Sequence, residues 1–528
     1  MADTSALHIS ASVGNRISLG PDRVAAPRAQ GAASARGPQL ASRAISLMTA
    51  GRSVKPTDEQ IAVIESCVRG ANLVIEAGAG TGKTTTLEMA AKAMGGRGIY
   101  VAYNRSIVDN AQRRFPGNVK CYTAHQLAYE SIGHRYASRL DGFRLPYRAI
   151  IPMLAIDSPI VLSDRRVIDE REQVRLAMQT VGKFCRSADD TLLPKHVPAT
   201  LGVEGEAAAY LAGRIHAIAV DIWIDLVDPR GGIPFVHDHY LKMWSLTEPK
   251  LNCDYLLFDE AQDADPLIAS ILTSQQVQRI AVGDSHQAIY GWRGAVDALA
   301  SWPAEERLYL LQSWRFGPEV ADEANKWLKV LGTNKRLAGS PYVDSAVGAC
   351  DAVDAVLCRT NAQAMREVLS ALDSGLKPFL MGGGWEMRNL AEAAIHLLSG
   401  KRTQHRELYA FQSWDEVVQY AMNEEGGASL RPSVQLIMDY GPDTILKATD
   451  ALVDEGRQDV TISTTHKVKG REWKAVRIAD DFRRSSTMGN GKHQQLADES
   501  AMLSYVAVTR AQERLDCSAL AWVDTIQN

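Results

Sequence analysis

Short apolar runs recur along the chain, and each is followed by a stretch with helical spacing. Residues 74–76 and 98–102 have the apolar character of short buried strands. Residues 84–94 and 106–115, which follow them, have the three-to-four-residue apolar period of a helix. The repeated order of strand and helix predicts parallel β-α units.

This pattern is interrupted and then resumes. Residues from about 125 to 235 are mainly helical in pattern and rich in arginine, and buried-strand patterns return at 255–258 and 279–282. A second series of apolar strands follows, at 308–311, 355–358, 378–381, 460–463 and 476–479. We therefore expect an α/β protein with two cores, each a parallel sheet flanked by helices and each carrying a helical insertion.

These patterns divide the chain as follows. The first core comprises 55–124 and 236–308, with its insertion at 125–235; the second core comprises 309–384 and 456–528, with a smaller helical insertion at 385–455. Residues 1–54 hold only two acids and no aromatic residue, which predicts a flexible N-terminal tail. The same composition resembles an organelle transit peptide, and a basic arm that touches DNA is a further alternative.

Composition narrows the class of protein. The 528 residues have a formal net charge of −4, so a nucleic-acid partner needs a local groove rather than a basic coat. The seven cysteines form no Cys-x-x-Cys pair, which favours a reducing compartment and disfavours a zinc ribbon or an iron–sulfur cluster. We see no apolar run near the roughly 20 residues that cross a bilayer and no secretory signal. We therefore expect no membrane partner and a cytoplasmic or nucleoid location, nuclear or organellar in a eukaryote.

The clearest chemical motif is a glycine-rich loop between a predicted strand and a predicted helix, at residues 76–85. In a phosphate loop the backbone N–H groups surround a triphosphate, a lysine reaches the β and γ phosphates, and a hydroxyl holds Mg²⁺. Lys83 and Thr84 fit the last two roles. We expect ATP and Mg²⁺ as cofactors, with the nucleotide held by Gly78, Ala79, Gly80, Thr81, Gly82, Lys83, Thr84 and Thr85.

An NTPase also needs acids at a strand end, and residues 256–263 supply them. Asp259 follows the apolar run Leu-Leu-Phe and can hold the metal, so the expected metal ligands are Thr84 and Asp259. Glu260 can act as general base toward the attacking water. Phosphoryl transfer further requires a positive group that stabilises charge on the transferred phosphoryl, which we expect to be one or more arginines.

Several motifs together resemble the UvrD/Rep/PcrA-type superfamily 1 helicases. Residues 259–263 resemble the family's DEXQD signature, and residues 283–295 resemble its GDxxQxIYxFRGA motif. Other stretches resemble further family motifs in the family's order, namely 57–60, 102–105, 123–125, 312–316, 464–473 and 505–511. The resemblance covers about 55–516. Residues 102–106 and 237–242 look most like the F-box DNA helicase branch.

The resemblance implies two RecA-like P-loop NTPase cores that close on ATP. Gln60 would contact the adenine edge, Trp314 would stack on the adenine, and Glu472 would bind the ribose. The implied catalytic residues are Lys83, Asp259, Glu260, Gln287, Arg315 and Arg510, with Gln287 as γ-phosphate sensor and both arginines supplied by the second core. The residues implied to contact DNA are Tyr103, Asn104, Thr123, His125, Tyr290, Trp292, Arg293 and His466. Aromatic rings among them would stack on any base.

The function implied is an ATP-dependent helicase or translocase that moves 3′→5′ on single-stranded DNA in replication, repair or recombination. The expected partners are single strands, junctions of single and double strands, and recombinase filaments or replication proteins. The alternative is an ATP-switched DNA-binding protein that remodels or strips protein–DNA filaments without processive unwinding. The motor subunit of a helicase–nuclease and an RNA helicase are further alternatives.

Two features admit simpler interpretations. His237 and His239 have a spacing that suits a metal, but no cysteine or further histidine lies nearby in the sequence, which disfavours zinc. Four arginines, at 135, 139, 144 and 148, predict a solvated face more than a patch that binds duplex DNA.

Overall fold

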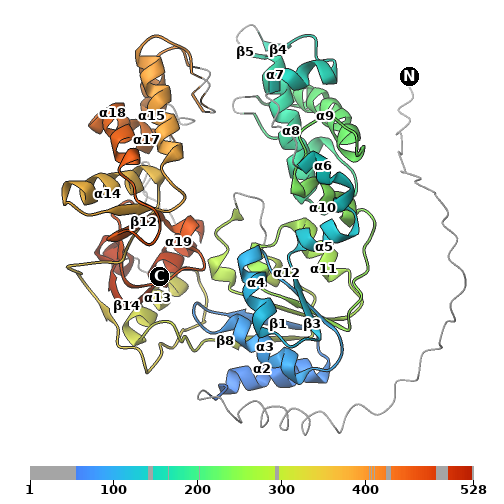
Figure 1. Cartoon of the computed structure of the whole chain (residues 1–528), viewed down its shortest axis with the longest axis vertical. Helices are drawn as coiled ribbons and strands as arrows, with labels where there is room; N and C mark the ends of the chain where they lie inside the picture. The colour runs from blue at the N-terminus through green and yellow to red at the C-terminus, as the bar shows by residue number, and fades with distance from the viewer. Residues whose placement is uncertain are drawn as a thin grey trace, which may run out of the picture.

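The computed structural model describes residues 55–140, 147–163, 166–200, 203–291, 297–403, 405, 407–408, 411–423, 430–482 and 498–525. Figure 1 shows two α/β lobes that lie side by side, with a helical insertion extending from each in the same direction. The predicted fold class, two parallel sheets flanked by helices with helical insertions, is confirmed.

The first sheet has six parallel strands in the order β3-β2-β6-β7-β1-β8. Their bounds are β1 Leu73–Ala77, β2 Gly98–Val101, β3 Val119–Tyr122, β6 Tyr255–Phe258, β7 Gln278–Gly283 and β8 Glu306–Leu310. The flanking helices are α2 Asp58–Arg69, α3 Lys83–Ala93, α4 Arg105–Arg114, α11 Pro266–Thr273 and α12 Ala298–Ser301. Because the strands are parallel, the loops that follow β1, β6 and β7 meet at one edge of the sheet, where ligands bind in open α/β folds.

One strand belongs to a different core from the one we expected. The run at 308–311 was assigned to the second core, yet β8 pairs in parallel with β1, with Leu73 opposite Glu306 and Ala77 opposite Leu310. The expected boundary at 308/309 therefore falls inside a strand of the first sheet. An apolar run shows that a strand exists, but its pairing partner depends on tertiary packing.

The second sheet also has six parallel strands, in the order β11-β12-β10-β13-β14-β9. Their bounds are β9 Ala346–Val347, β10 Ala355–Cys358, β11 Pro378–Leu380, β12 Val460–Thr464, β13 Trp473–Ile478 and β14 Ala511–Asp516. Helices α13 Pro318–Val330, α14 Asn361–Asp373 and α19 Asp498–Val508 flank it. β9 and β14, like β3 of the first sheet, were not predicted, since the three are short or mixed in polarity.

The first insertion is mainly helical but also contains a small antiparallel hairpin. Its helices are α5 Ala124–Ser131, α6 Ala137–Leu140, α7 Tyr147–Ile150, α8 Glu170–Arg186, α9 Gly205–Val227 and α10 His237–Ser245, and its hairpin is β4 Ile160–Ser163 with β5 Arg166–Ile168. Its apolar side chains form one continuous core with those of the first sheet. His239 accepts a hydrogen bond at Nδ1 from the Val236 N–H and is buried at the start of α10.

Arg139 in this insertion is not part of a solvated face. Its guanidinium is almost fully buried and donates to the carbonyl oxygens of Asp225 and Ile233 and to the Asp225 carboxylate, at 2.8–2.9 Å. It also lies over the Phe235 ring, 5.0 Å from the centroid. These contacts satisfy carbonyls at the end of α9, so the side chain holds the insertion together. Arg144 and Arg148 carry no described side chain.

Helix α9 contains no uninterrupted apolar run of about 20 residues, as expected, but its average composition is apolar. Among the described residues it is the one helix that is long and apolar enough to span a membrane by length and composition, with a mean hydropathy of 1.3. One face of α9, which includes Leu211, Ile215 and Ile222, is buried in the core of the insertion. Ile215, Ile218 and Val220 raise the average hydropathy of the helix, but charged residues at 206, 214, 221 and 225 interrupt its apolar positions.

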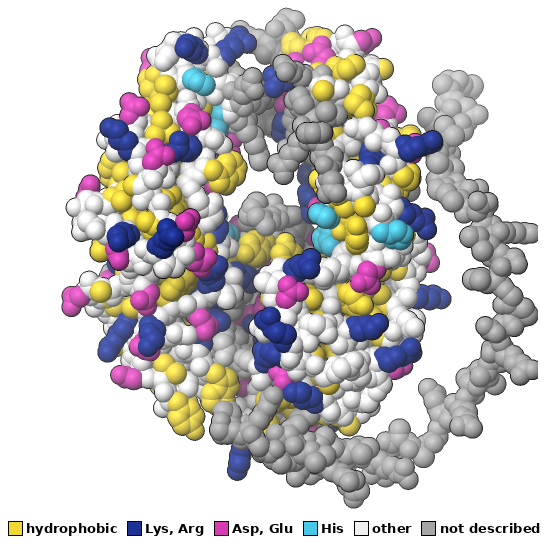
Figure 2. All heavy atoms as spheres, viewed as in Figure 1, with side chains coloured by type: hydrophobic (Ala, Val, Ile, Leu, Met, Phe, Trp, Pro, Cys, Tyr) yellow, Lys and Arg dark blue, Asp and Glu magenta, His cyan; other side chains and the backbone are white. Residues whose placement is uncertain are grey.

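The second insertion consists of α15 Trp385–Leu398, α16 Trp414–Asn423, α17 Arg431–Tyr440 and α18 Pro442–Asp450. Their buried side chains share a hydrophobic core with α14 and with strands β10 and β12. On the face shown in Figure 2, basic and acidic side chains are interspersed over both lobes, in keeping with the small net charge.

Candidate active site and nucleic-acid interface

The glycine-rich loop follows β1 and leads into α3. Gly80 and Gly82 have φ angles of 73° and 79°, which residues with a side chain rarely adopt. Thr81 Oγ1 donates to the Gly78 carbonyl at 2.9 Å and fixes the turn. Gly82 is the N-cap of α3 and gives it no side-chain cap, so the first N–H groups of this helix remain available for an anion.

The second core packs directly against this loop. A Cβ atom on Gly78 would collide with Leu337, and one on Gly80 would lie 2.6 Å from both Arg315 Cβ and Ser313 Oγ. The Trp314 N–H also donates to the Gly80 carbonyl at 2.9 Å. The loop therefore lies at the interface of the two cores, and its glycines allow the close approach.

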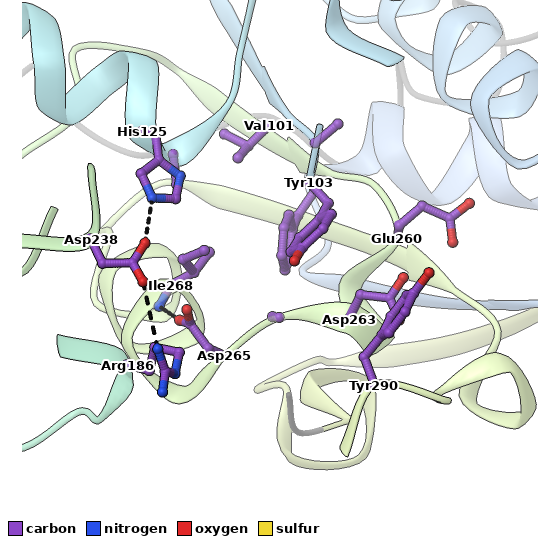
Figure 3. A pocket seen from close by; sticks show the side chains of 14 residues that line it. Val101, Tyr103, His125, Arg186, Asp238, Glu260, Asp263, Asp265, Ile268 and Tyr290 are labelled. Carbon is purple, nitrogen blue, oxygen red and sulfur yellow. Dashed lines mark hydrogen bonds and ion pairs between the residues drawn. The ribbon is translucent and has the colours of Figure 1, made fainter. Parts of the chain in front are cut away.

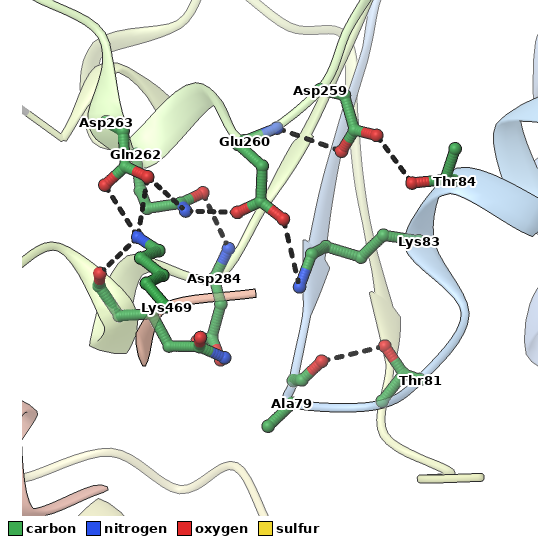
Figure 4. Close-up of polar contacts among 12 residues, drawn as sticks. Ala79, Thr81, Lys83, Thr84, Asp259, Glu260, Gln262, Asp263, Asp284 and Lys469 are labelled. Atoms are coloured by element: carbon green, nitrogen blue, oxygen red, sulfur yellow. Dashed lines mark hydrogen bonds and ion pairs between the residues drawn. The ribbon is translucent and has the colours of Figure 1, made fainter. Parts of the chain in front are cut away.

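The acid at the end of β6 lies beside the first turn of α3. Asp259 Oδ2 accepts hydrogen bonds from Thr84 Oγ1 and from the Tyr100 hydroxyl, both at 2.7 Å, as Figure 4 shows for Thr84. A hydroxyl oxygen and a carboxylate oxygen are suitable ligands for Mg²⁺, which binds to few protein ligands and completes its coordination with phosphate and water. The two residues expected to hold the metal thus fit it.

Glu260 has strained backbone geometry. Its φ of 54° lies in the left-handed region, which costs a non-glycine residue on the order of 1–3 kcal/mol and is common at active sites. The strain directs the carboxylate toward the loop: Oε1 lies 3.9 Å from Lys83 Nζ, and Oε2 accepts from Gln262 Nε2 at 2.6 Å (Figure 4).

The two adjacent acids have opposite pKa shifts. Burial, reinforced by the charge of Glu260, raises the pKa of Asp259. Burial also acts to raise the pKa of Glu260, but the charges of Lys83 and Lys469 and the Gln262 hydrogen bond outweigh it and lower the pKa. Glu260 is therefore ionised at neutral pH, the state that a general base requires.

Two arginines from the second core reach the loop region. Arg315 Nη1 donates to the Thr509 carbonyl at 3.0 Å, and its Nε forms an ion pair with Glu472. Arg510 is fully buried, and its Nη2 donates to Gln287 Oε1 at 3.2 Å. Burial, with the nearby charge of Arg315, lowers the pKa of Arg510 to about 9, so the guanidinium stays charged at neutral pH.

Gln60 and Trp314, two of the three residues expected to bind the nucleoside, lie near Gly82. A Cβ on Gly82 would have Gln60 Nε2 at 3.6 Å and Trp314 Cδ1 at 4.0 Å. Gln60 also caps α2, where Oε1 accepts the Thr57 N–H at 3.1 Å, and its Nε2 donates to Thr86 Oγ1 at 3.1 Å. The amide keeps one donor hydrogen and one lone pair with which to contact a base.

Three of the residues expected to contact DNA line a single cavity of about 520 Å³. Tyr103, His125 and Tyr290 lie around it, together with Glu260 and Asp263 (Figure 3). The cavity therefore extends from Glu260 to the aromatic residues of the predicted DNA track.

His125 is held in place rather than projecting freely. Its Nε2 lies 3.1 Å from Asp238 Oδ1, and the other oxygen of Asp238 lies 3.6 Å from Arg186 Nη1 (Figure 3). The His125 hydrogen bond, against the opposing effect of burial, lowers the pKa of Asp238. Sequence reasoning did not identify Asp238 or Arg186, which reach the cavity from α10 and from the end of α8.

The other residues expected to contact DNA do not lie together: two cap helices, one lies in a 3₁₀ turn, and two lie outside the described residues. Asn104 Oδ1 caps α4 by accepting the Ile107 N–H at 3.0 Å, and Thr123 Oγ1 caps α5 by accepting the Gln126 N–H at 3.1 Å. Their side chains therefore already have a structural role. His466 lies in the 3₁₀ turn Thr465–Val468, where its carbonyl accepts from the Tyr290 hydroxyl at 2.9 Å. Trp292 and Arg293 lie outside the described residues.

The ion pair between Lys469 and Asp263, which crosses the core interface, was not predicted from the sequence. Lys469 Nζ contacts Asp263 at 2.7 Å and the Gln287 carbonyl at 2.6 Å, and both side chains are nearly buried (Figure 4). Burial raises the pKa of Asp263 to about 6, although Lys469 opposes the shift. The sequence shows both residues within motifs but not that they meet.

Comparison with known proteins agrees with this geometry. A family model described as an AAA domain matches residues 59–293, and one described as a UvrD-like helicase C-terminal domain matches residues 399–521. The F-box DNA helicase protein 1 of Schizosaccharomyces pombe is 30% identical over 505 residues, covering 87% of this chain and 57% of that protein. The F-box DNA helicase 1 of Gallus gallus is 29% identical over 88% of this chain and 49% of that protein.

The ATP-dependent DNA helicase UvrD2 of Mycobacterium tuberculosis is 25% identical over 334 residues, 50% of this chain and 46% of that protein. The chain thus spans about half the length of the curated relatives that it matches. The motifs, the two parallel sheets and these matches agree: the chain belongs to the UvrD-like superfamily 1 helicases.

Proposed function

We propose that this protein is an ATP-dependent DNA helicase that translocates 3′→5′ on single-stranded DNA. The observation that carries the proposal is the position of Gln287. It receives a hydrogen bond from Arg510 of the second core, and it lies three residues before Tyr290, which lines the cavity of the predicted DNA track. A change in the distance between the two cores at the nucleotide would therefore move Gln287 and, through it, Tyr290 in the cavity where DNA is expected to bind.

The chemistry assigned to the protein's own residues is as follows. Lys83 and the N–H groups at the start of α3 bind the phosphates of ATP. Glu260 accepts the proton of the attacking water, and Arg315 and Arg510 stabilise the charge on the transferred phosphoryl. A Mg²⁺ ion bound with the nucleotide near Thr84 and Asp259 would supply further charge stabilisation.

Movement follows from the cross-core contacts. ATP would draw the cores together through Arg315 and Arg510, and hydrolysis would release them. Each cycle would shift one core along the strand while the other holds it. Tyr103 and Tyr290 would hold bases by stacking, which needs no particular base sequence. The same motor would displace proteins such as recombinase filaments from the strand. All seven cysteines are free, which supports a reducing compartment.

The test measures ATP hydrolysis and end-label displacement on oligonucleotides labelled at either end. We expect single-stranded DNA to raise the hydrolysis rate at least tenfold. A 5′-end label should respond after a delay that grows with oligonucleotide length, because a 3′→5′ motor arrives there. A length-dependent delay at the 3′ label would overturn the polarity. If DNA raises the hydrolysis rate but neither label shows a length-dependent delay, the ATP-switched DNA-binding protein would be favoured. If DNA does not raise the hydrolysis rate, the proposal of a translocating helicase would be overturned.

The matched variants are Lys83→Ala and Lys120→Ala. Lys83 lies at the phosphate loop, whereas Lys120 is an exposed residue of β3. We expect Lys83→Ala to abolish hydrolysis with an unchanged melting temperature, and Lys120→Ala to behave as wild type. Full ATP hydrolysis by the Lys83→Ala variant would show that this phosphate loop is not the site of hydrolysis.

A further inference from the structure

Tyr505 joins the two cores at a point that the proposed mechanism does not use. It lies in α19 of the second core and is fully buried. Its hydroxyl accepts a hydrogen bond from the Ala79 N–H at 3.2 Å and donates to Asp284 Oδ2 at 3.0 Å. A single hydroxyl thus contacts two separate loops of the first core, the phosphate loop and the loop after β7.

The protonation states of Tyr505 and Asp284 fix the direction of the two hydrogen bonds made by the Tyr505 hydroxyl, which we call the relay. Burial, with the charge of Asp284, raises the pKa of Tyr505 well above its ordinary value, so the hydroxyl keeps its proton. Asp284 stays ionised, because its hydrogen bond with His286 and the charge of Lys83 overcome burial and hold its pKa well below the ordinary range. The direction of the two hydrogen bonds is therefore set: Ala79 donates to Tyr505, and Tyr505 donates to Asp284.

Ala79 connects this relay to the nucleotide. Its N–H belongs to the loop that presents backbone donors to phosphate, and here that donor is taken up by Tyr505. A bound triphosphate would attract the same class of donor and would therefore compete with Tyr505 for the Ala79 N–H.

Asp284 connects the relay to the DNA side. Its carboxylate also accepts from Gln287 Nε2 at 2.8 Å, and it begins the 3₁₀ turn Ser285–Gln287. Tyr290 follows three residues later and lines the DNA cavity. Only five residues separate Asp284 from Tyr290, and three of them form the 3₁₀ turn Ser285–Gln287, so a displacement of Asp284 would be passed to Tyr290 over a short path.

We propose that Tyr505 is a positioning residue that couples the occupancy of the phosphate loop to the grip on single-stranded DNA. The inference rests on the proposed function. It predicts that the hydroxyl matters for the mutual effect of ATP and DNA, and not for either binding site alone. Such a mutual effect is a coupling free energy, and it is measured as a ratio of affinities.

The test is Tyr505→Phe, which removes only the hydroxyl. The affinity for a fluorescent oligothymidine is measured with and without a non-hydrolysable ATP analogue, together with ATP hydrolysis. We expect the ratio of the two DNA affinities to fall to within about twofold of one, since the coupling free energy is lost. The DNA-stimulated kcat should fall about tenfold, an effect of the size of one buried hydrogen bond. The KM for ATP and the DNA-free hydrolysis rate should change less than about threefold, because Lys83, Asp259 and Glu260 keep their contacts.

The matched control is Tyr136→Phe. Tyr136 is also a buried tyrosine, and its hydroxyl donates to the Val227 carbonyl at 2.8 Å within the first insertion, away from the core interface. Its variant should keep the wild-type coupling ratio. A wild-type ratio in Tyr505→Phe, or an equal loss of basal and DNA-stimulated hydrolysis, would overturn the inference.

A second measurement covers the case in which Tyr505→Phe does not fold. In the wild-type protein without DNA, the ATP analogue should change hydrogen exchange in the peptide that spans 284–291. An unchanged peptide would also overturn the inference. Failure of the proposed function is distinguishable from both results, because the wild-type protein would then show no DNA-stimulated hydrolysis at all.

Discussion

Arg510 of the second core donates from Nη2 to Oε1 of Gln287 in the first core over 3.2 Å. The same guanidinium donates from Nε to the Val506 carbonyl at 2.9 Å and from Nη1 to the Arg471 carbonyl at 3.3 Å. Its Nε and Nη1 thus fix the side chain within its own core, whereas Nη2 donates both to Thr509 Oγ1 of its own core, at 3.1 Å, and to Gln287 of the other core.

This arrangement predicts that lysine cannot take over the role of Arg510, so the Arg510→Lys variant should lose activity. Lysine keeps the charge but has no planar guanidinium with which to make all four hydrogen bonds. We expect kcat for DNA-stimulated hydrolysis to fall about 10³-fold, the scale of a catalytic arginine, with a much smaller change in the KM for ATP. The control is Arg514→Lys, at an exposed position of β14. Steady-state kinetics with kcat within threefold of wild type would contradict the assigned role.

Asp263→Asn tests the ion pair across the core interface through its pH dependence. The folded protein holds the Asp263 pKa at about 6, above its ordinary value, through burial. Between about pH 4 and 6 the folded state therefore binds more protons than the unfolded state, and the stability contribution of Asp263 declines as the pH rises. Asparagine does not titrate. The difference in melting temperature, wild type minus variant, should therefore fall from pH 4 to 6 and level off above. A pH-independent difference would show that Asp263 has an ordinary pKa.

Tyr290→Ala and Tyr290→Phe separate stacking from hydrogen bonding in the DNA cavity. Removal of the ring should weaken single-stranded DNA binding by about tenfold, since base stacking contributes roughly 1–3 kcal/mol per base. Phenylalanine keeps the ring and loses the hydroxyl, which donates to the His466 carbonyl, so its DNA affinity should stay close to wild type. Fluorescence anisotropy measures both. Tyr342→Ala, at a tyrosine that is 85% exposed, is the control. Equal weakening in the Ala and Phe variants would rule out stacking.

Arg139→Ala should destabilise the first insertion without a direct effect on DNA contacts. The change leaves several carbonyls without this donor, whereas the Asp225 carboxylate keeps the N–H donors of Gly232 and Ile233, so we expect a cost on the order of 1–3 kcal/mol. Thermal unfolding should show a melting temperature lowered by several degrees, whereas Arg135→Ala, at an exposed neighbour, should leave it unchanged. A variant with wild-type stability and weaker duplex binding would restore the interpretation of these arginines as a DNA patch.

The sequence was a good guide wherever local chemistry is decisive. The strands β1, β2, β6 and β7 were predicted from their apolar runs, since strands covered on both faces of a parallel sheet are apolar throughout. The phosphate loop was recognisable because its glycines must adopt φ angles that other residues avoid, as Gly80 and Gly82 do.

The tertiary structure decided which distant residues meet. The assignment of β8 to the first sheet, the burial of Arg139 and the links of Tyr505 and Lys469 across the core interface all join residues far apart in the chain. A sequence records that an arginine or tyrosine is present, but not the path that the chain takes to bring a partner within hydrogen-bond distance. That path is set by the packing of both sheets and their helices together, because burial leaves each of these polar groups only the partners that the fold provides.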